Sequence, residues 1–420
     1  MKTPVFSLCA LGAALTFGIA TAQAQPKMPA PPLAEMPVAA DELAAKKVAA
    51  TRNFGELETV AQFFGPMPTG VTVSQTGRIF VNFPRWGDNV PFTVAEIVDG
   101  KAVAFPSAKV NSFGTNGTRA ALSMEKTERA RRERASHFVG VQSVVVDSAD
   151  RLWVLDTGSI AFNPTAPGGP KLVGIDLTTN EIVKTIHFSP DIARPKSYFN
   201  DVRFDLTAGR EGTAYITDSG DSGIVVVDLA SGIATRHLDE HPSTQVVPKF
   251  VPYVEGDAMY STPPGKFPGY VQFASDGIAL SPDGSRLYYC PLASRRLYSV
   301  STALLRNSKA TEALVENSII DHGEKGMSDG LEADAQGRIY VTLVEQNAIA
   351  RRLPNSLYQT VVRDPRLLWP DTLSIANDGY LYVIANQLHR QKGFNYGKDL
   401  RVKPYSLFRV KIDGTPIVRK

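Results

Sequence analysis

The chain has 420 residues, of which 43% are apolar and 21% are charged, with 33 glycines and 29 prolines. This balance is typical of a globular protein and excludes collagen, a coiled coil or a wholly disordered chain. Because 45 Lys and Arg residues face 42 Asp and Glu residues, the net charge is only +3, which gives no reason to expect nucleic acid or an anionic membrane as partner.

The first 24 residues have the three parts of a secretory signal peptide. Lys2 supplies the positive charge, residues 5–20 form an almost unbroken apolar run, and Ala22-Gln23-Ala24 fits the small-x-small cleavage site. We therefore expect a secreted or periplasmic protein whose mature chain begins at Gln25. The apolar run is too short for a comfortable membrane span, and no later run reaches 18 residues, so no transmembrane helix is expected.

Residues 25–50, rich in Pro and Ala, are expected to form an N-terminal arm. The chain has two cysteines, and cleavage of the signal peptide removes Cys9. A mature chain with Cys290 alone forms no internal disulfide, so its core must stabilise it. Cys290 lies in an apolar strand run and is expected to be buried.

One pattern recurs six times along the rest of the chain: a polar opening, an apolar strand, a Gly or Asp turn, and a second strand rich in aromatic and β-branched residues. We take the equivalent openings to be Gly70, Gln142, Asp201, Asp276, Asp329 and Asp371, spaced by 72, 59, 75, 53 and 42 residues. Such spacings are typical of four-stranded blades with variable loops, whereas a solenoid has more regular repeats. The sequence thus predicts an all-β protein, a single six-bladed β-propeller over residues 51–420.

Outer hairpins are expected to complete several blades. They pair residues 171–177 with 181–186, 223–229 with 233–237, and 408–412 with 415–418. Residues 124–135 break the pattern with many charges. A basic patch for an anionic partner is one interpretation, but the interleaved signs favour a solvated helix with charge pairs.

Several motifs resemble the major royal jelly protein/yellow family. They include Phe83-Pro-Arg-Trp86, Leu152-Trp-Val-Leu-Asp-Thr-Gly158, Ala214-Tyr-Ile-Thr-Asp-Ser-Gly220 and Tyr340-Val-Thr-Leu-Val-Glu-Gln346. The resemblance runs from about Phe64 to Gln387 and implies a secreted six-bladed propeller. Insect members usually carry cysteine pairs, which this chain lacks, so it is more similar to bacterial members. Some members of the family bind small amines, and others have been linked to dopachrome conversion.

The blade openings also resemble gluconolactonase-type propellers, a group of metal-dependent lactonases. In a propeller the starts of the inner strands and the ends of the second strands converge around the axis at one face. Here the first set is Gln142, Asn200, Asp201, Asp276, Asp329 and Asp371. The second set is Arg85, Trp86, Asp156, Asp218, Glu345 and Asn386.

So many carboxylates around one axis are costly unless a cation, protons or basic groups compensate them. Oxygen-only ligands suit Ca²⁺ or another oxygen-preferring divalent cation. We therefore predict a metal site formed by Asn200, Asp201, Asp276, Asp329 and Asp371. The alternative is that these residues are turn formers whose side chains accept from backbone N–H groups. For a ligand at the channel mouth, the predicted residues are Trp86, Gln142, Asp156, Asp218, Glu345 and Asn386.

Three functions remain open. The first is a small-molecule binder, because aromatic residues near the mouth suit a flat or cationic ligand; the candidates are Phe83, Trp86, Phe199 and Trp369. The second is a divalent-metal-dependent lactonase or related hydrolase. The third is a platform for protein interactions. The sequence carries no P-loop, so phosphoryl-transfer chemistry has no motif behind it. We favour the binder.

Overall fold

The structure is a computed structural model that describes residues 54–114 and 117–419. These residues belong to one compact unit, Asn53–Lys420. The predicted signal peptide, its cleavage site and the arm of residues 25–50 lie outside the described residues. None of the helices in the described ranges has the length and apolarity needed to cross a bilayer.

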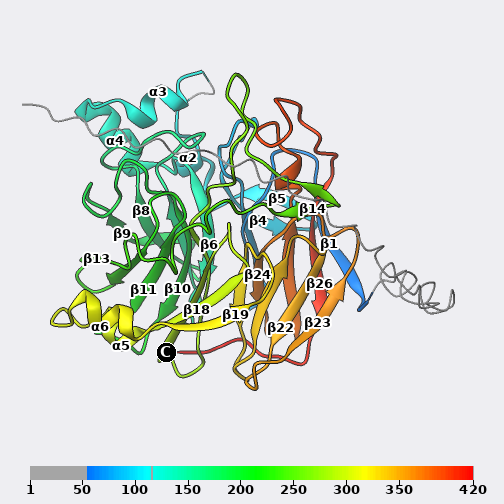
Figure 1. Ribbon diagram of the computed structural model, residues 1–420. Coiled ribbons are helices and arrows are strands. Elements are labelled where there is room, and N and C mark those ends of the chain that lie inside the picture. The colour runs from blue at the N-terminus through cyan, green and yellow to red at the C-terminus, as the bar shows by residue number, and fades with distance from the viewer. Residues whose placement is uncertain (1–53, 115–116, 420) are drawn as a thin grey trace, which may run out of the picture. The chain divides into compact units, whose positions relative to one another are not determined.

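The described residues form six four-stranded antiparallel sheets and one two-stranded hairpin (Figure 1). Each sheet has one edge strand that lies next to the edge strands of two neighbouring sheets. These six strands are β2 (Val71–Val73), β6 (Val141–Val146), β10 (Phe199–Asp205), β16 (Ser275–Leu280), β20 (Leu331–Ala333) and β24 (Pro370–Ile375). These six strands contact one another in a closed ring, β2 to β6, β10, β16, β20, β24 and back to β2. The predicted six-bladed β-propeller is therefore confirmed, with these strands innermost.

The second strands are β3 (Ile79–Asn82), β7 (Arg151–Asp156), β11 (Thr213–Asp218), β17 (Arg286–Pro291), β21 (Ile339–Leu343) and β25 (Tyr380–Ala385). The third strands are β4 (Val94–Val98), β8 (Lys171–Asp176), β12 (Ile224–Asp228), β18 (Arg296–Ser301), β22 (Ala348–Arg352) and β26 (Tyr405–Lys411). The outermost strands are β5 (Lys101–Ala104), β9 (Glu181–His187), β13 (Ala234–His237), β19 (Ile320–Glu324), β23 (Tyr358–Arg363) and β1 (Leu57–Phe63).

The burial of the strands follows from their place in the blade. Strands β7 and β11 are buried along almost their whole length, because each blade packs between two neighbours. The outermost strand β5 alternates between exposed and half-buried residues. Cys290, in β17, is fully buried as predicted.

The last blade is closed by the earliest described strand. Strand β1 pairs antiparallel with β26, from Leu57 opposite Val410 to Phe63 opposite Tyr405. Because β25 occupies the other edge of β26, the predicted hairpin of residues 408–412 with 415–418 is wrong. Pro416 instead forms a bridge with Asp334 of the neighbouring blade. Closure by β1 leaves β26 without an open edge.

Short helices and one hairpin lie outside the blades. The helices are α2 (Ala108–Asn111), α3 (Arg119–Met124), α4 (Glu128–Ser136), α5 (Thr302–Leu305), α6 (Glu312–Asn317) and the 3₁₀ turn η1 (Leu388–Arg390), and the hairpin joins β14 (Tyr253–Val254) to β15 (Asp257–Ala258). Figure 1 shows α2 to α4 and β14 at the same end of the propeller.

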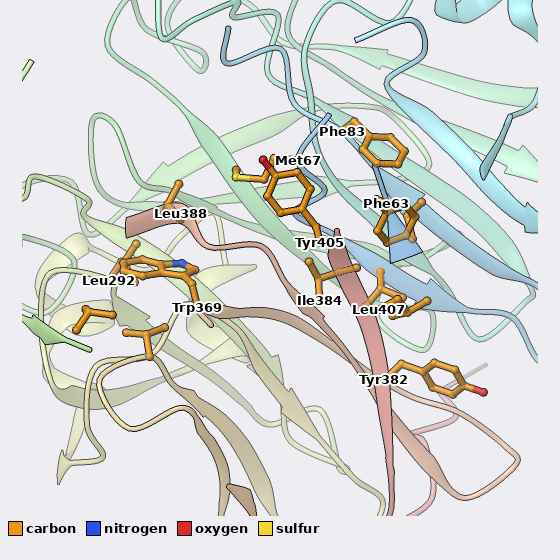
Figure 2. Packing of buried hydrophobic residues seen from close by; sticks show 14 of the residues in the cluster. Phe63, Met67, Phe83, Leu292, Trp369, Tyr382, Ile384, Leu388, Tyr405 and Leu407 are labelled. Atoms are coloured by element: carbon orange, nitrogen blue, oxygen red, sulfur yellow. The ribbon is translucent and has the colours of Figure 1, made fainter. Parts of the chain in front are cut away.

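The largest apolar cluster connects the last blade to the axis. Its members include Phe63 of β1, Tyr405 of β26, and Leu292, Trp369 and Leu388 nearer the channel (Figure 2). The side chains at this end of the channel therefore pack directly against the core, which holds them in place.

Candidate functional site

A small cavity lies where the inner strands begin. Its volume is about 50 Å³. Polar side chains contributed by five blades line it: Gln142, Asn200, Ser219, Asp276, Asp329 and Asp371. The apolar part of the lining consists mainly of Trp86, Phe162, Tyr198, Phe273, Leu292, Leu388 and Phe394. The cavity thus combines acidic and aromatic side chains at the mouth of the channel.

A repeated irregularity of the inner strands places the polar side chains. The pairing of β10 with β11 shifts register between Phe199 and Val202, and β16 and β24 show the same shift at the same point. A bulge of this kind re-aims side chains at a strand end. The residue after the first paired position is Asn200 in β10, Asp276 in β16 and Asp371 in β24.

This alignment corrects the predicted phase of the third repeat. Asn200, and not Asp201, corresponds to Asp276 and Asp371. Asp201 accepts hydrogen bonds from the hydroxyl of Ser143 at 2.7 Å and from Nη1 of Arg203 at 3.1 Å. It does not line the cavity, and its charge is compensated by a buried ion pair.

Three buried carboxyl groups form what we call the acidic floor: Asp276, Asp329 and Asp371. The carboxyl groups of Asp276 and Asp329 are hydrogen-bonded to each other. Burial, together with the charge of Asp329, raises the pKa values of Asp276 and Asp371 well above the usual range. Burial also raises the pKa of Asp329 to about 6. The floor therefore retains protons near neutral pH that ordinary aspartates have lost.

Fixed donors orient two of these carboxylates. The indole Nε1 of Trp369 donates to Oδ2 of Asp329 at 2.6 Å, and Nδ2 of Asn386 donates to Oδ2 of Asp371 at 2.6 Å. Asn386 is thus placed behind the floor, as the partner of Asp371. In each carboxylate the donor bonds to Oδ2 and does not bond to Oδ1.

An uncharged chain of hydrogen bonds forms the opposite wall. Nε1 of Trp86 donates to the hydroxyl of Tyr198 at 2.6 Å, and this hydroxyl donates to Oε1 of Gln142 at 3.0 Å. Nε2 of Gln142 then donates to Oδ1 of Asn200 at 2.8 Å. The chain fixes the direction of each amide and hydroxyl, so this wall is preorganised.

Aromatic rings cover the cavity. Phe162 stacks on Trp86 with ring centroids 5.1 Å apart and also contacts Tyr198 at 5.0 Å. Elsewhere in the lining, the ring of Phe273 lies edge-on to the ring of Phe394, with ring centroids 6.4 Å apart. Faces of aromatic rings carry partial negative charge and attract cations.

Two predicted ligand-binding residues, Asp156 and Asp218, form hydrogen bonds and ion pairs within their own blades. Asp156 accepts from the backbone N–H groups of Val139 and Gly140 and pairs with Nζ of Lys171 at 2.7 Å. In the next blade Asp218 accepts from the backbone N–H of Tyr198 and pairs with Arg236. Both are fully buried and lie outside the cavity lining.

Glu345 is also turned away from the cavity. It accepts from Nε of Arg295 at 2.7 Å and from the backbone N–H of Tyr253 at 2.9 Å. These contacts tie its blade to the β14–β15 hairpin. The predicted residues that the structure does bring together are Trp86, Gln142, Asn200, Asp276, Asp329 and Asp371.

The aromatic lining differs from the expected one. Phe83 and Phe199 are core residues, and Trp369 lies behind Asp329. Sequence reasoning missed Phe162, Tyr198, Phe273 and Phe394. Tyr198 directly precedes an inner strand, which is a usable signal. The three phenylalanines lie outside the strands, at positions that do not recur in the repeats.

The oxygen donors of the floor are of the kind that Ca²⁺ prefers. As arranged, however, Asp276 and Asp329 bond to each other, and Trp369 and Asn386 occupy oxygens of Asp329 and Asp371. Among residues 54–114 and 117–419, no three His, Cys, Asp or Glu side chains gather so that they could hold a metal ion. The residues therefore do not fit a metal in this arrangement.

Known proteins share this architecture. The luciferin-regenerating enzyme aligns with 87% of this chain and 99% of its own, with a TM-score of 0.51 and 11% identity. A protein assigned as a gluconolactonase aligns with 86% of this chain and 93% of its own, with a TM-score of 0.50 and 11% identity. At such identities the similarity shows the fold alone.

Sequence comparison is more specific. Major royal jelly protein 7 of Apis mellifera is 26% identical over 306 residues, which cover 66% of this chain and 65% of the relative. Protein yellow of Drosophila madeirensis is 26% identical over 336 residues, covering 74% of this chain and 54% of the relative. The chain therefore spans less than two thirds of the length of these relatives. The model of the major royal jelly protein family matches residues 139–410, and the chain belongs to that family.

Proposed function

We propose that this protein is an exported propeller that binds a small organic cation, an amine carrying a flat ring, at the mouth of its channel. The observation that carries the proposal is the acidic floor beneath aromatic walls. Three buried carboxyl groups and the rings of Trp86, Phe162 and Tyr198 line one cavity.

The charge of the floor selects the sign of the ligand. An ammonium group brings three donors and a positive charge, which match carboxylate oxygens in a site shielded from water. An anion faces repulsion from the same carboxylates. The aromatic walls add cation–π attraction and a surface on which a flat ring stacks.

The binding experiment is calorimetry with phenethylamine on the wild type and on Asp276→Asn. Because the variant lacks one of the carboxyl groups that can give up its proton to balance an ammonium charge, we expect affinity to fall at least about tenfold. The matched control is Asp283→Asn, in the turn after the same strand, where Asp283 bonds Ser281 and Ser285. The control should bind like the wild type. Equal affinities in all three proteins would contradict the proposal.

Export rests on the signal-peptide pattern of residues 1–24. Mass spectrometry of the protein recovered from the periplasm or medium should find Gln25 as the first residue. A protein that retains Met1 in those fractions would contradict this part of the proposal.

A Ca²⁺-dependent lactonase or hydrolase is the second candidate, favoured by the oxygen-only donors of the floor. It requires Asp276 and Asp329 to separate and turn toward the ion. If it is correct, Ca²⁺ raises the melting temperature of the wild type, because binding to the native state stabilises it, and the shift disappears in Asp276→Asn. No shift with Ca²⁺ leaves the amine-binding function as the better account.

A further inference from the structure

The inner cavity is too small for the ring of an aromatic amine. Its volume of about 50 Å³ has room for an ammonium group or a few water molecules, since one water needs roughly 10–15 Å³ by the same measure. A larger groove of about 350 Å³ lies next to it. The two are separated by a shared wall made of Phe162, Tyr198, Ser219 and Phe273.

Within this wall Phe162 is the side chain that stands out into solvent. It is 51% exposed, whereas Tyr198 is 7% and Ser219 3% exposed. Hydrogen bonds also hold Tyr198 to Trp86 and Gln142, and bond Ser219 to the carbonyl of Tyr198. The ring of Phe162 is held by stacking on Trp86 and by a tilted contact with the ring of Tyr198. Of these three, Phe162 is therefore the side chain that moves at the lowest cost.

The backbone beneath this ring is strained. Ala161 and Phe162 have φ values of 53° and 59°, a left-handed conformation that is unfavourable for residues with a side chain. The loop is anchored on either side of the ring, because Ala161 N–H donates to the carbonyl of Arg85 and Nδ2 of Asn163 donates to the carbonyl of Ile160. Such strain is often stored where a segment moves in function.

We propose that Phe162 is a gate whose ring occupies the place of the ligand's own ring, and that its displacement joins the inner cavity to the outer groove. This rests on the proposed function. In the closed state the ring of Phe162 fills the slot against Trp86 and Tyr198. An arylalkylamine enters through the groove, displaces this ring, stacks in its place and directs its ammonium group to the acidic floor.

The gate makes a kinetic prediction. If the open state is populated at about 10% or less, removing the ring raises the association rate by about tenfold or more. Stopped-flow fluorescence with phenethylamine should show this increase in Phe162→Ala. Phe267→Ala removes a ring that is 97% exposed and outside the cavity lining, and it should leave the rate unchanged.

The outcomes separate the two proposals. Equal association rates in the wild type and Phe162→Ala, or a Phe162→Ala protein that only releases phenethylamine faster, would overturn the gate and leave amine binding intact. Failure of phenethylamine to bind the wild type and Phe162→Ala alike would overturn the proposed function, and the gate with it.

Discussion

The indole N–H of Trp369 donates a hydrogen bond of 2.6 Å to Oδ2 of Asp329. Trp369 is fully buried, has a left-handed φ of 58°, and stacks on the ring of His389 at 5.8 Å. One strained and tightly packed residue therefore fixes the direction of a carboxyl group on the acidic floor. This connects the core of the last blade to the chemistry of the channel mouth.

Replacing Trp369 by Phe removes this donor. We expect the free energy of unfolding to fall by about 1–3 kcal/mol and phenethylamine affinity to fall as Asp329 loses its orientation. Trp153→Phe is the matched control, because Nε1 of Trp153 donates to Oδ2 of Asp147 at 2.8 Å, away from the cavity. Urea denaturation and calorimetry should show a stability loss in both variants, with an affinity loss in Trp369→Phe alone. Unchanged affinity in Trp369→Phe contradicts the positioning role.

The acidic floor should make stability depend on pH. Because the pKa of Asp329 is raised to about 6, the native state binds more protons than the unfolded state between about pH 4 and 6, and stability falls as pH rises through that window. Asp276→Asn relieves the crowding of carboxylates. It should be more stable than the wild type by about 1–3 kcal/mol at pH 7.5, and the gain should vanish near pH 4. Urea denaturation at both pH values checks this. A variant less stable than the wild type at pH 7.5 would refute this electrostatic account.

The affinity for an amine should rise with pH over the range in which the stability falls. The ammonium group competes with protons held on Asp329, whose pKa lies near 6. Affinity for phenethylamine is therefore expected to rise by about tenfold between pH 5 and pH 8, while the amine itself stays protonated. Calorimetry across this range checks it. An affinity that is flat with pH contradicts a role for the floor carboxylates in holding the cation.

An ion pair between Arg419 and Asp205 holds the segment after β26 against the propeller. Arg419 donates from Nε to Oδ1 of Asp205 at 2.8 Å and from Nη1 to the carbonyl of Pro282 at 2.9 Å. Figure 1 shows this segment running along the end of the propeller opposite α2 to α4. Arg419→Ala should lower the free energy of unfolding by about 1–3 kcal/mol, because Asp205 is left buried and unpaired, and should leave amine affinity unchanged. A change in affinity without a change in stability would show that the two ends are coupled.

The repeats in the sequence predicted the blades because each inner strand carries the same alternation of polar opening and apolar run. They also located Asp276, Asp329 and Asp371, which share one position in the repeat. The phase of the third blade was wrong by one residue, because Asn200 and Asp201 are both polar and a bulge, not composition, decides which one faces the cavity.

Other features depended on contacts that no local pattern contains. Closure of the last blade needed the pairing of β1 with β26, which lie at opposite ends of the described chain. Asp156 and Asp218 were predicted to line the channel mouth from the ends of the second strands, yet Lys171 of β8 and Arg236 of β13 compensate their charges. The aromatic cover came from segments between strands, whose course is set by tertiary packing.

We propose that the channel mouth selects a small organic cation by its charge. The most direct test compares phenethylamine with 3-phenylpropanoate by calorimetry on the wild-type protein at pH 7.5. The two share ring and linker and differ in the sign of their charge. We expect saturable binding of phenethylamine and at least about 100-fold weaker binding of 3-phenylpropanoate. Equal affinities, or tighter binding of the carboxylate, would contradict it.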